Sequence, residues 1–175
     1  KQARGEYVAT LNNDTIVEKE WLSELVNVME LNRRIGICAS KILFYNNRNI
    51  INSSGICVDK ISGFTWDRGF GDKDGEEYKE RQVVFGACAA AALYRKDMLN
   101  QIGLFDEDFF AYHEDVDLAW RAQLCGWKCM YVPAAIVYHH LSATAGLNSP
   151  FKEYFTNRNK IWLIVKYYPS PQIYK

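Results

Sequence analysis

The chain has 175 residues, of which 49% are hydrophobic and 14% aromatic, so it has enough apolar material for the core of one domain. Its 21 basic and 21 acidic side chains cancel to a net charge of zero, which argues against a nucleic-acid-binding protein. The sequence contains no run of 18 apolar residues, so no segment of it is predicted to span a membrane. Five scattered cysteines without paired metal spacing indicate reduced core thiols in a cytoplasmic protein.

Strands and helices are predicted to alternate in the first part of the chain. Tyr7–Leu11 is a short apolar segment typical of a buried strand, and apolar residues then recur at helical spacing from about Glu18 to Leu31. Another strand starts at Ile35, so these segments predict a β–α–β step. Ile50 to Val58 is predicted as one further strand.

The middle of the chain begins with a glycine-rich polar stretch, Gly63–Gly75, which is predicted to be a mobile loop. Trp66 on this loop either covers a bound sugar or anchors the loop to the core, and the two interpretations have equal weight. Val83–Tyr94 is predicted as one buried strand. Lys96–Gln101 is predicted as a short helix that ends at Gly103.

The last segment, Phe151 to Tyr168, follows an apolar strand at Ala134–Tyr138 and is predicted to be a helix. Its basic side chains alternate with aromatic and aliphatic ones; they are Lys152, Arg158, Lys160 and Lys166. Such a helix either lies against an anionic membrane or packs on the domain with its lysines in water. Packing is the commoner use, and the two arrangements are compatible.

An aromatic run delivers three acidic residues, Glu114, Asp115 and Asp117, to the start of an amphipathic helix. A helix N-terminus exposes unpaired N–H groups, so a carboxylate there is expected to be held ionised and fixed in direction, as a catalytic base requires. The structural alternative is that Glu114 and Asp115 only cap the helix. Asp117 lies about 200° around the helix from Asp115, so it is expected to pair with Arg121 or a nearby backbone group.

A second acidic site follows the first predicted strand, in the turn Asn12-Asn13-Asp14. In open α/β sheets, ligands bind at the carboxyl ends of strands. A carboxylate at such an end can bind a hard cation whose other ligands are water and phosphate oxygens, and Asp14 fits this role. The alternative is an Asx turn that only reverses the chain.

In their order and spacing, these segments resemble the family 2 glycosyltransferases, especially the bacterial rhamnosyltransferase-like branch. The matching segments are Leu11–Thr15 (an acidic metal-binding turn), Phe85–Cys88 with Leu93–Lys96 (a strand lining the acceptor site), Ile102–Glu107 through Glu114–Arg121 (the catalytic helix), Gly126-Trp127, Val132-Pro133, Val137–His139 with Ser142, and Arg158-Asn159.

The resemblance implies an α/β fold of the GT-A type, a mixed sheet flanked by helices. Residues 1–175 would form a single partial catalytic domain that holds the metal-binding turn, the acceptor region, the catalytic helix and the C-terminal helix. The family's N-terminal nucleotide-binding half has no counterpart before Tyr7 in this sequence. We therefore expect the isolated chain to self-associate and to turn over no nucleotide sugar.

The resemblance also implies a function. The expected enzyme is an inverting glycosyltransferase that moves a sugar from a nucleotide-diphosphate donor to a saccharide or lipid-linked acceptor in cell-surface polysaccharide synthesis, in the cytoplasm or at the inner face of the cell membrane. Asp115 is the implied base and Glu114 the second candidate, while Asp14 and His139 would bind Mg²⁺ or Mn²⁺. Asp14, Asp115 and His139 should then converge on one cleft at the carboxyl edge of the sheet.

Donor or acceptor binding is expected for a further set of residues, which are Asn13, Trp66, Gly86, Ala87, Asp106 and Arg158. For Arg158, a packing salt bridge is an equally good account. Two other classes of protein stay open. A non-catalytic carbohydrate-binding or scaffolding remnant of the fold would hold the acids apart, and a metal-dependent phosphohydrolase or nucleotidyltransferase would need two or more clustered metal-binding acids.

Overall fold

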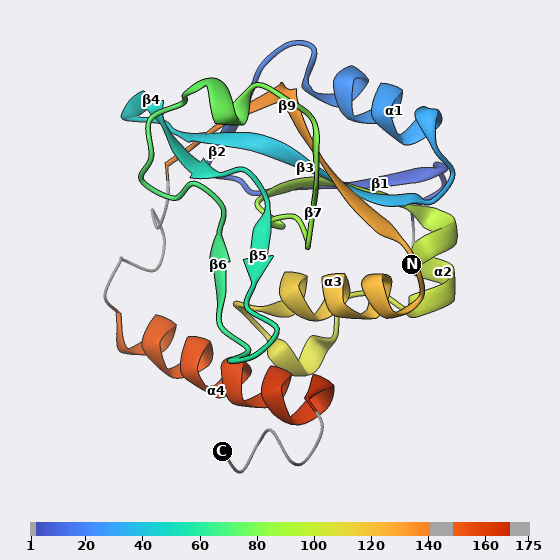
Figure 1. Ribbon diagram of the computed structural model, residues 1–175, viewed down its shortest axis with the longest axis vertical. Coiled ribbons are helices and arrows are strands. Elements are labelled where there is room, and N and C mark those ends of the chain that lie inside the picture. The colour runs from blue at the N-terminus through green and yellow to red at the C-terminus, as the bar shows by residue number, and fades with distance from the viewer. Residues whose placement is uncertain (1–2, 141–148, 169–175) are drawn as a thin grey trace.

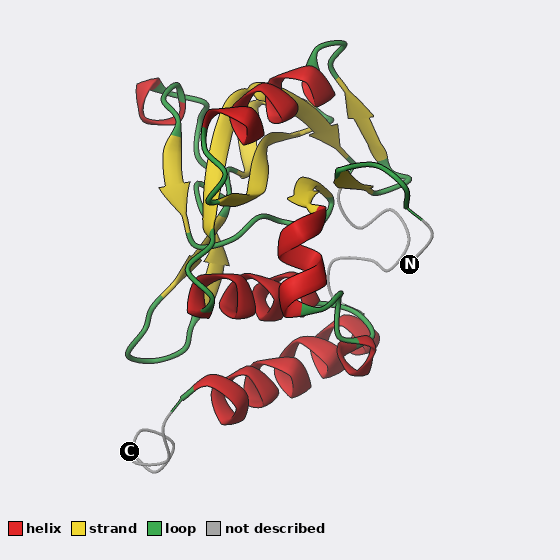
Figure 2. Ribbon diagram, turned by 90° about the vertical axis from the view of Figure 1, so that its right-hand side faces the viewer, coloured by secondary structure: helices red, strands yellow, loops and turns green. Residues whose placement is uncertain are grey.

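The structure is a computed structural model that describes residues 3–140 and 149–168. In these ranges a mixed sheet has helix α1 on one side and helices α2 and α3 on the other, and helix α4 forms the outermost layer next to α3 (Figures 1 and 2). The helices are α1 (Trp21–Leu31), α2 (Lys96–Ile102), α3 (Glu114–Leu124) and α4 (Pro150–Tyr167). Short 3₁₀ turns cover Glu76–Tyr78 and Glu107–Phe109. The predicted mixed sheet flanked by helices is confirmed.

The sheet has seven strands within the described residues, in the order β1-β8-β3-β9-β2, with β4 beside β3 and β7 beside β9. Its strands are β1 (Tyr7–Leu11), β2 (Thr15–Val17), β3 (Ile35–Phe44), β4 (Asn47–Ser53), β7 (Gln82–Val84), β8 (Ala91–Arg95) and β9 (Lys128–His139). A separate two-stranded ribbon, β5 (Ile56–Val58) with β6 (Thr65–Asp67), extends from the sheet toward α4 (Figure 1).

The central strands are buried on both faces because helices cover both. Successive side chains of a strand point to opposite faces, so Cys38 and Leu93 pack under α1 while Ile37 and Tyr94 pack against α2 and α3. Leu25, fully buried in α1, belongs to the first of these two cores. This double burial explains why the strands read as continuous apolar runs in the sequence.

The two strands of the predicted β–α–β step run in the same direction, as predicted. Strands β1 and β3 both pair antiparallel with β8, where Val8 and Ile37 are each opposite Tyr94, so β1 and β3 run the same way. They are not neighbours, however, because β8 lies between them. Strand β9 pairs parallel with β3, so the carboxyl ends of β1, β3 and β9 meet at one edge together with the amino end of β8.

Two strand predictions were wrong in their extent. Ile50 to Val58 forms parts of two strands, β4 and β5, because Gly55 adopts the left-handed backbone conformation (φ +113°) between them. Val83–Tyr94 is also two strands, β7 and β8. The connection at Phe85–Ala90 carries the chain from the side of β9 to the gap between β1 and β3, so one straight strand cannot span it.

The remaining elements follow the sequence closely. The helix predicted at Lys96–Gln101 is α2, and Gly103 (φ +86°) ends it by donating its N–H to the carbonyl of Leu99. The stretch Gly63–Gly75 is not entirely a loop, because Thr65–Asp67 pairs with β5. The final predicted helix is α4.

Candidate active site

A cavity of about 540 Å³ opens at the edge where β1, β9 and the amino end of β8 meet. Its walls come from the turn after β1, the β5–β6 ribbon, the loop before β8, the segment before α3, the end of β9 and the first turns of α4. The ionisable side chains that line it include Asp67, His113, Glu114, Asp115, His139 and Lys152. An open cavity with several ionisable groups is the expected form of a catalytic site.

Asp115 is held in the wall of this cavity by two backbone N–H groups. Its Oδ2 accepts a hydrogen bond from Ala89 N at 3.1 Å, and its Oδ1 accepts one from Val116 N at 2.8 Å. Burial raises the pKa of Asp115, and these backbone hydrogen bonds only partly oppose that effect. The carboxyl is therefore fixed in direction, as predicted.

Glu114 is the second carboxyl at this helix start. Burial, reinforced by the charge of Asp115, raises the pKa of Glu114 to about 7. Its buried Oε2 has no hydrogen-bond partner in the described part of the chain. The expectation that the helix N-terminus holds the acids ionised is therefore wrong for Glu114, because burial outweighs the helix dipole at this position. Both carboxyls instead exchange protons closer to neutral pH than free ones do.

The backbone before these acids has an unusual conformation. Phe110, Tyr112 and His113 have φ values of 60°, 66° and 66°, in the left-handed region that costs an L-residue about 1–2 kcal/mol each. His113 is the N-cap of α3, and burial, helped by Lys160, lowers its pKa to about 4, so its imidazole is neutral at pH 7. His113 therefore occupies the N-cap position without a capping hydrogen bond from its side chain, and Glu114 and Asp115 lie within the helix.

His139 and Asp14 form a pair beside the cavity. His139 Nε2 lies 3.2 Å from Asp14 Oδ1, and His139 Nδ1 lies 2.9 Å from Asn52 Oδ1. In the tautomer in which Nδ1 donates to the Asn52 amide oxygen, the Nε2 lone pair of the neutral ring faces the Asp14 carboxylate. Burial lowers the pKa of His139, and the nearby Asp14 charge only partly opposes this, which favours the neutral ring.

Two lone-pair donors that face each other fit a divalent cation, and the hydrogen bond from Nδ1 to Asn52 orients the ring as in metal sites. In residues 3–140 and 149–168 no group of three or more His, Cys, Asp or Glu side chains is arranged to hold a metal ion. Asp14 and His139 could therefore supply only part of a coordination shell, and the rest must come from water and a bound ligand.

The predicted convergence on one cleft is confirmed for Asp115 and His139, whereas Asp14 lies behind His139 and does not itself line the cavity. Asp115 and His139 line the same cavity, and Asp14 touches His139 from the turn between β1 and β2. The backbone locks this arrangement, because His140 N donates to the carbonyl of Asp14 at 3.0 Å. Trp66 also lines the cavity, is 44% exposed, and stacks on Phe64. The chemical roles of these residues stay predictions.

Other predicted binding residues lie away from the cavity. Gly86 and Ala87 are buried beneath α3, where a Cβ on Gly86 would lie 2.6 Å from Ala119 Cβ, and the cavity wall is formed by the following residues, Cys88–Ala90. Asn13 is exposed on its turn and does not line the cavity.

Asp106 and Arg158 make structural contacts instead. Asp106 binds Lys166 at 3.0 Å, and Arg158 donates to the carbonyls of Asp108 and Phe109 at 2.7 and 2.9 Å. Neither side chain lines the cavity. Ser142 lies outside the described residues.

Sequence analysis missed two charged residues of the cavity, Asp67 and Lys152. Burial raises the pKa of Asp67 to about 6, against a hydrogen bond from Ser53, and the charge of Asp115 adds to the rise. The nearby Lys152 charge opposes it. Asp67 reaches the cavity only because β6 pairs with β5, and no local sequence pattern predicts that pairing.

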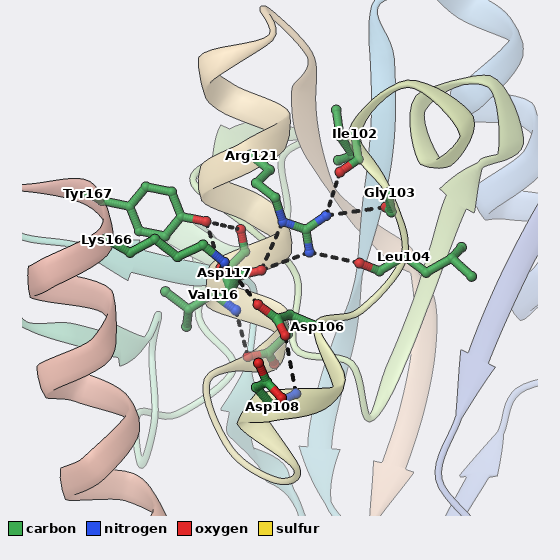
Figure 3. Close-up of polar contacts among 11 residues, drawn as sticks. Ile102, Gly103, Leu104, Asp106, Asp108, Val116, Asp117, Arg121, Lys166 and Tyr167 are labelled. Atoms are coloured by element: carbon green, nitrogen blue, oxygen red, sulfur yellow. Dashed lines mark hydrogen bonds and ion pairs between the residues drawn. The ribbon is translucent and has the colours of Figure 1, made fainter.

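Asp117, the third acid of α3, has a structural role. Its fully buried carboxylate binds Arg121 Nη2 at 2.7 Å, as predicted, and also accepts hydrogen bonds from Lys166 at 2.7 Å and Tyr167 at 2.6 Å (Figure 3). Arg121 in turn donates to three carbonyls that follow α2, those of Ile102, Gly103 and Leu104. The network joins α3 to both α2 and α4.

The fold is that of a GT-A glycosyltransferase. The chain belongs to glycosyl transferase family group 2, whose family model matches residues 7–165. The predicted family and fold are therefore confirmed. None of the helices in the described part of the chain has the length and hydropathy needed to cross a membrane.

Two relatives have names that describe a rhamnosyltransferase and O-antigen biosynthesis. The chain is 43% identical over 72 residues to the N-acetylglucosaminyl-diphospho-decaprenol L-rhamnosyltransferase of Mycobacterium tuberculosis, covering 40% of this chain and 22% of that protein. It is 28% identical over 154 residues to the O-antigen biosynthesis protein RfbC of Myxococcus xanthus, covering 82% of this chain and 12% of that protein. The chain thus spans a minor part of the length of both.

One solved structure is similar to almost the whole of this chain. GalNAc-T7, crystallised with UDP, GalNAc and Mn²⁺, matches with a TM-score of 0.67 at 16% identity, over 95% of this chain and 32% of that one. At this identity the match shows the fold alone.

Proposed function

We propose that this chain carries the acceptor and catalytic side of an inverting glycosyltransferase that transfers a sugar from a nucleotide-diphosphate donor to a saccharide or lipid-linked acceptor. One observation carries the proposal: Asp115, fixed by two backbone N–H groups, shares a cavity with His139, whose free nitrogen faces Asp14. A base and an anion-stabilising site therefore lie on one cavity, as sugar transfer requires.

In this mechanism Asp115 accepts the proton of an acceptor hydroxyl as its oxygen attacks the anomeric carbon. The new C–O bond forms on the face opposite the departing diphosphate, which inverts the configuration of that carbon. The two hydrogen bonds from Ala89 and Val116 keep the carboxylate aimed at the cavity. Glu114, whose pKa is about 7, is the second candidate for the base.

Asp14 and His139 would hold a divalent cation, Mg²⁺ or Mn²⁺, and such an ion stabilises the negative charge on a leaving diphosphate. The protein's part is to keep the two donor atoms close and correctly oriented. Asn52 does this for His139 by accepting the Nδ1 proton, and the backbone contact of His140 does it for Asp14.

Replacing Asp14 by asparagine tests both the reaction and the cation site. In the complete natural protein, nucleotide release from a panel of nucleotide-diphosphate sugars should require Mn²⁺ or Mg²⁺. Asp14→Asn should raise the metal concentration for half-maximal activity by about 10–100-fold, because one charged ligand is lost. The exposed Asp97→Asn serves as a matched control and should change nothing.

An unchanged metal requirement in Asp14→Asn would remove Asp14 from the ligand set. A wild-type protein that binds saccharides but releases no nucleotide from any donor would instead identify the non-catalytic carbohydrate-binding alternative. These two failures are distinct, because only the second abolishes activity in the wild type.

We also propose that α4 rests on an anionic lipid surface. Phe151, Tyr154, Ile161 and Val165 are 46%, 61%, 61% and 63% exposed, and they recur at helical spacing on this outermost helix (Figure 2). Lysines flank this stripe, as at helices that lie in the headgroup region. The cavity is lined by Lys152 of the same helix, so a lipid-linked acceptor would enter beside the membrane.

Vesicle flotation measures this contact. Ile161→Asp should lower the fraction of protein bound to vesicles of anionic lipid at least about 5-fold, because an aspartate on the stripe is both polar and repelled by the lipid. Leu124→Asp is the matched control, since Leu124 is 69% exposed but lies at the end of α3. Equal loss in both variants would refute a specific role for α4.

A further inference from the structure

Glu114 and Asp115 follow directly after a strained piece of backbone. Three residues that are not glycine, Phe110, Tyr112 and His113, have left-handed φ values just before the helix that carries both acids. Such a conformation persists only where surrounding contacts hold it. The contacts that hold this segment therefore determine where the two carboxyls point.

Asn159 of α4 supplies those contacts. Its side chain is fully buried, and its amide nitrogen lies 2.9, 2.8 and 2.6 Å from the carbonyl oxygens of Phe109, Ala111 and Tyr112. Two N–H bonds are thus shared among three acceptors. The Asn159 carbonyl is itself fixed, because it accepts a hydrogen bond from Arg158 Nε at 2.9 Å. No other side chain would satisfy the last two carbonyls within the described residues.

We propose, on the basis of the transferase function above, that Asn159 is a positioning residue for the reaction. It does not line the cavity and would touch neither sugar nor nucleotide. By holding the carbonyls of Phe109 to Tyr112, it presents Glu114 and Asp115 to the acceptor in one orientation. The proposal explains why a helix outside the main sheet carries a buried polar side chain with every donor and acceptor used.

The docking of α4 does not depend on Asn159. Lys166 and Tyr167, two turns further along α4, bind the carboxylate of Asp117 (Figure 3), and Leu163 packs against Phe109 in a separate apolar cluster. A change at Asn159 should therefore loosen the segment before α3 while α4 stays in place. Loosening of that segment without loss of α4 docking would therefore distinguish a positioning role of Asn159 from a general role in packing.

Asn159→Asp tests the proposal with an almost isosteric change, because it replaces the N–H donors by a carboxylate oxygen that the three carbonyls repel. In the complete protein we expect kcat to fall about 100-fold, as for a misplacement of catalytic groups by about 1 Å, with the donor KM nearly unchanged. The pH profile is read in the neutral variant Asn159→Ser, where the acid limb should move to lower pH, because carboxyls that reach water lose the rise in pKa caused by burial. Asn157→Asp, the same change at an exposed position of α4, should leave both unchanged.

Hydrogen–deuterium exchange on the 175-residue chain gives a readout that needs no activity. Amides from Phe110 to Val116 should exchange faster in Asn159→Asp, and those of Leu163 to Tyr167 should not. If the wild-type protein transfers no sugar, the proposed function fails, and this exchange result still decides whether Asn159 holds the segment. If Asn159→Asp does not fold, Asn159→Ser, which keeps one donor, should give intermediate exchange. Unchanged exchange and an unchanged acid limb in a folded variant would overturn the proposal.

Discussion

Asp115→Asn should lower kcat about 1,000-fold, within the range for loss of a general base, while donor affinity changes little. Asparagine keeps the shape of the side chain and one oxygen, but it cannot accept a proton. One of the two backbone contacts, from Ala89 or Val116, is lost in the variant, so its thermal midpoint must be measured beside the wild type. Single-turnover nucleotide release in the complete protein measures the chemical step.

Two further observations sharpen this test. Glu114→Gln should lower kcat by no more than about 10-fold if Glu114 only supports the base, and a larger loss there than in Asp115→Asn would exchange their roles. In the wild type, kcat/KM should rise with pH above the usual carboxyl range, because burial raises the pKa of both carboxyls, that of Glu114 to about 7, and only a deprotonated carboxylate accepts a proton. An acid limb near pH 4 would exclude these buried groups as the base.

Asp117→Ala should destabilise the protein by about 3–5 kcal/mol, which is the cost of leaving the partners of a buried ion pair without their counter-charge. Arg121, Lys166 and Tyr167 all bind this fully buried carboxylate (Figure 3), so the variant leaves two cations and a hydroxyl without it. Urea denaturation of the 175-residue chain, compared by midpoint at constant m, measures the loss.

Asp106→Ala is the matched control for this network. Asp106 also binds Lys166, at 3.0 Å, but its side chain is 33% exposed, so its loss should cost less than about 1 kcal/mol. Similar losses in the two variants would show that the buried carboxylate contributes no more than a surface pair. A small effect in both would mean that α4 is held to α3 mainly by apolar contacts such as Leu163.

Local patterns were sufficient to predict much of this fold. The apolar strand at Tyr7–Leu11 and the helix that ends at Gly103 depend on near neighbours in the sequence, and both formed as predicted. Val83–Tyr94 was predicted as one strand because a run of small apolar residues has the same composition in a buried strand and in a buried connection. Only the order of strands in the sheet shows that this segment must change partners.

Some members of the site were predictable from the sequence, but its electrostatics were not. Asp14, Asp115 and His139 each occupy a recognisable place at a strand or helix end, so their meeting could be expected. The raised pKa of Glu114 could not be predicted, because it results from burial by segments distant in the chain. Asp67 was missed for the same reason, and the contacts of Asn159, a residue within the family resemblance, were not predicted because its partners come from another element.

The pairing of the first two strands has a consequence for how the protein folds. Strand β1 pairs only with β8, and β2 pairs only with β9, the last strand of the described sheet. During synthesis on the ribosome, the turn that contains Asp14 therefore stays unanchored until β9, which ends at His139, has been made. Such long-range closure folds slowly and leaves strand edges exposed meanwhile. We expect the turn that carries Asp14 to be among the last parts of the domain to become ordered, and early folding intermediates to be prone to aggregation.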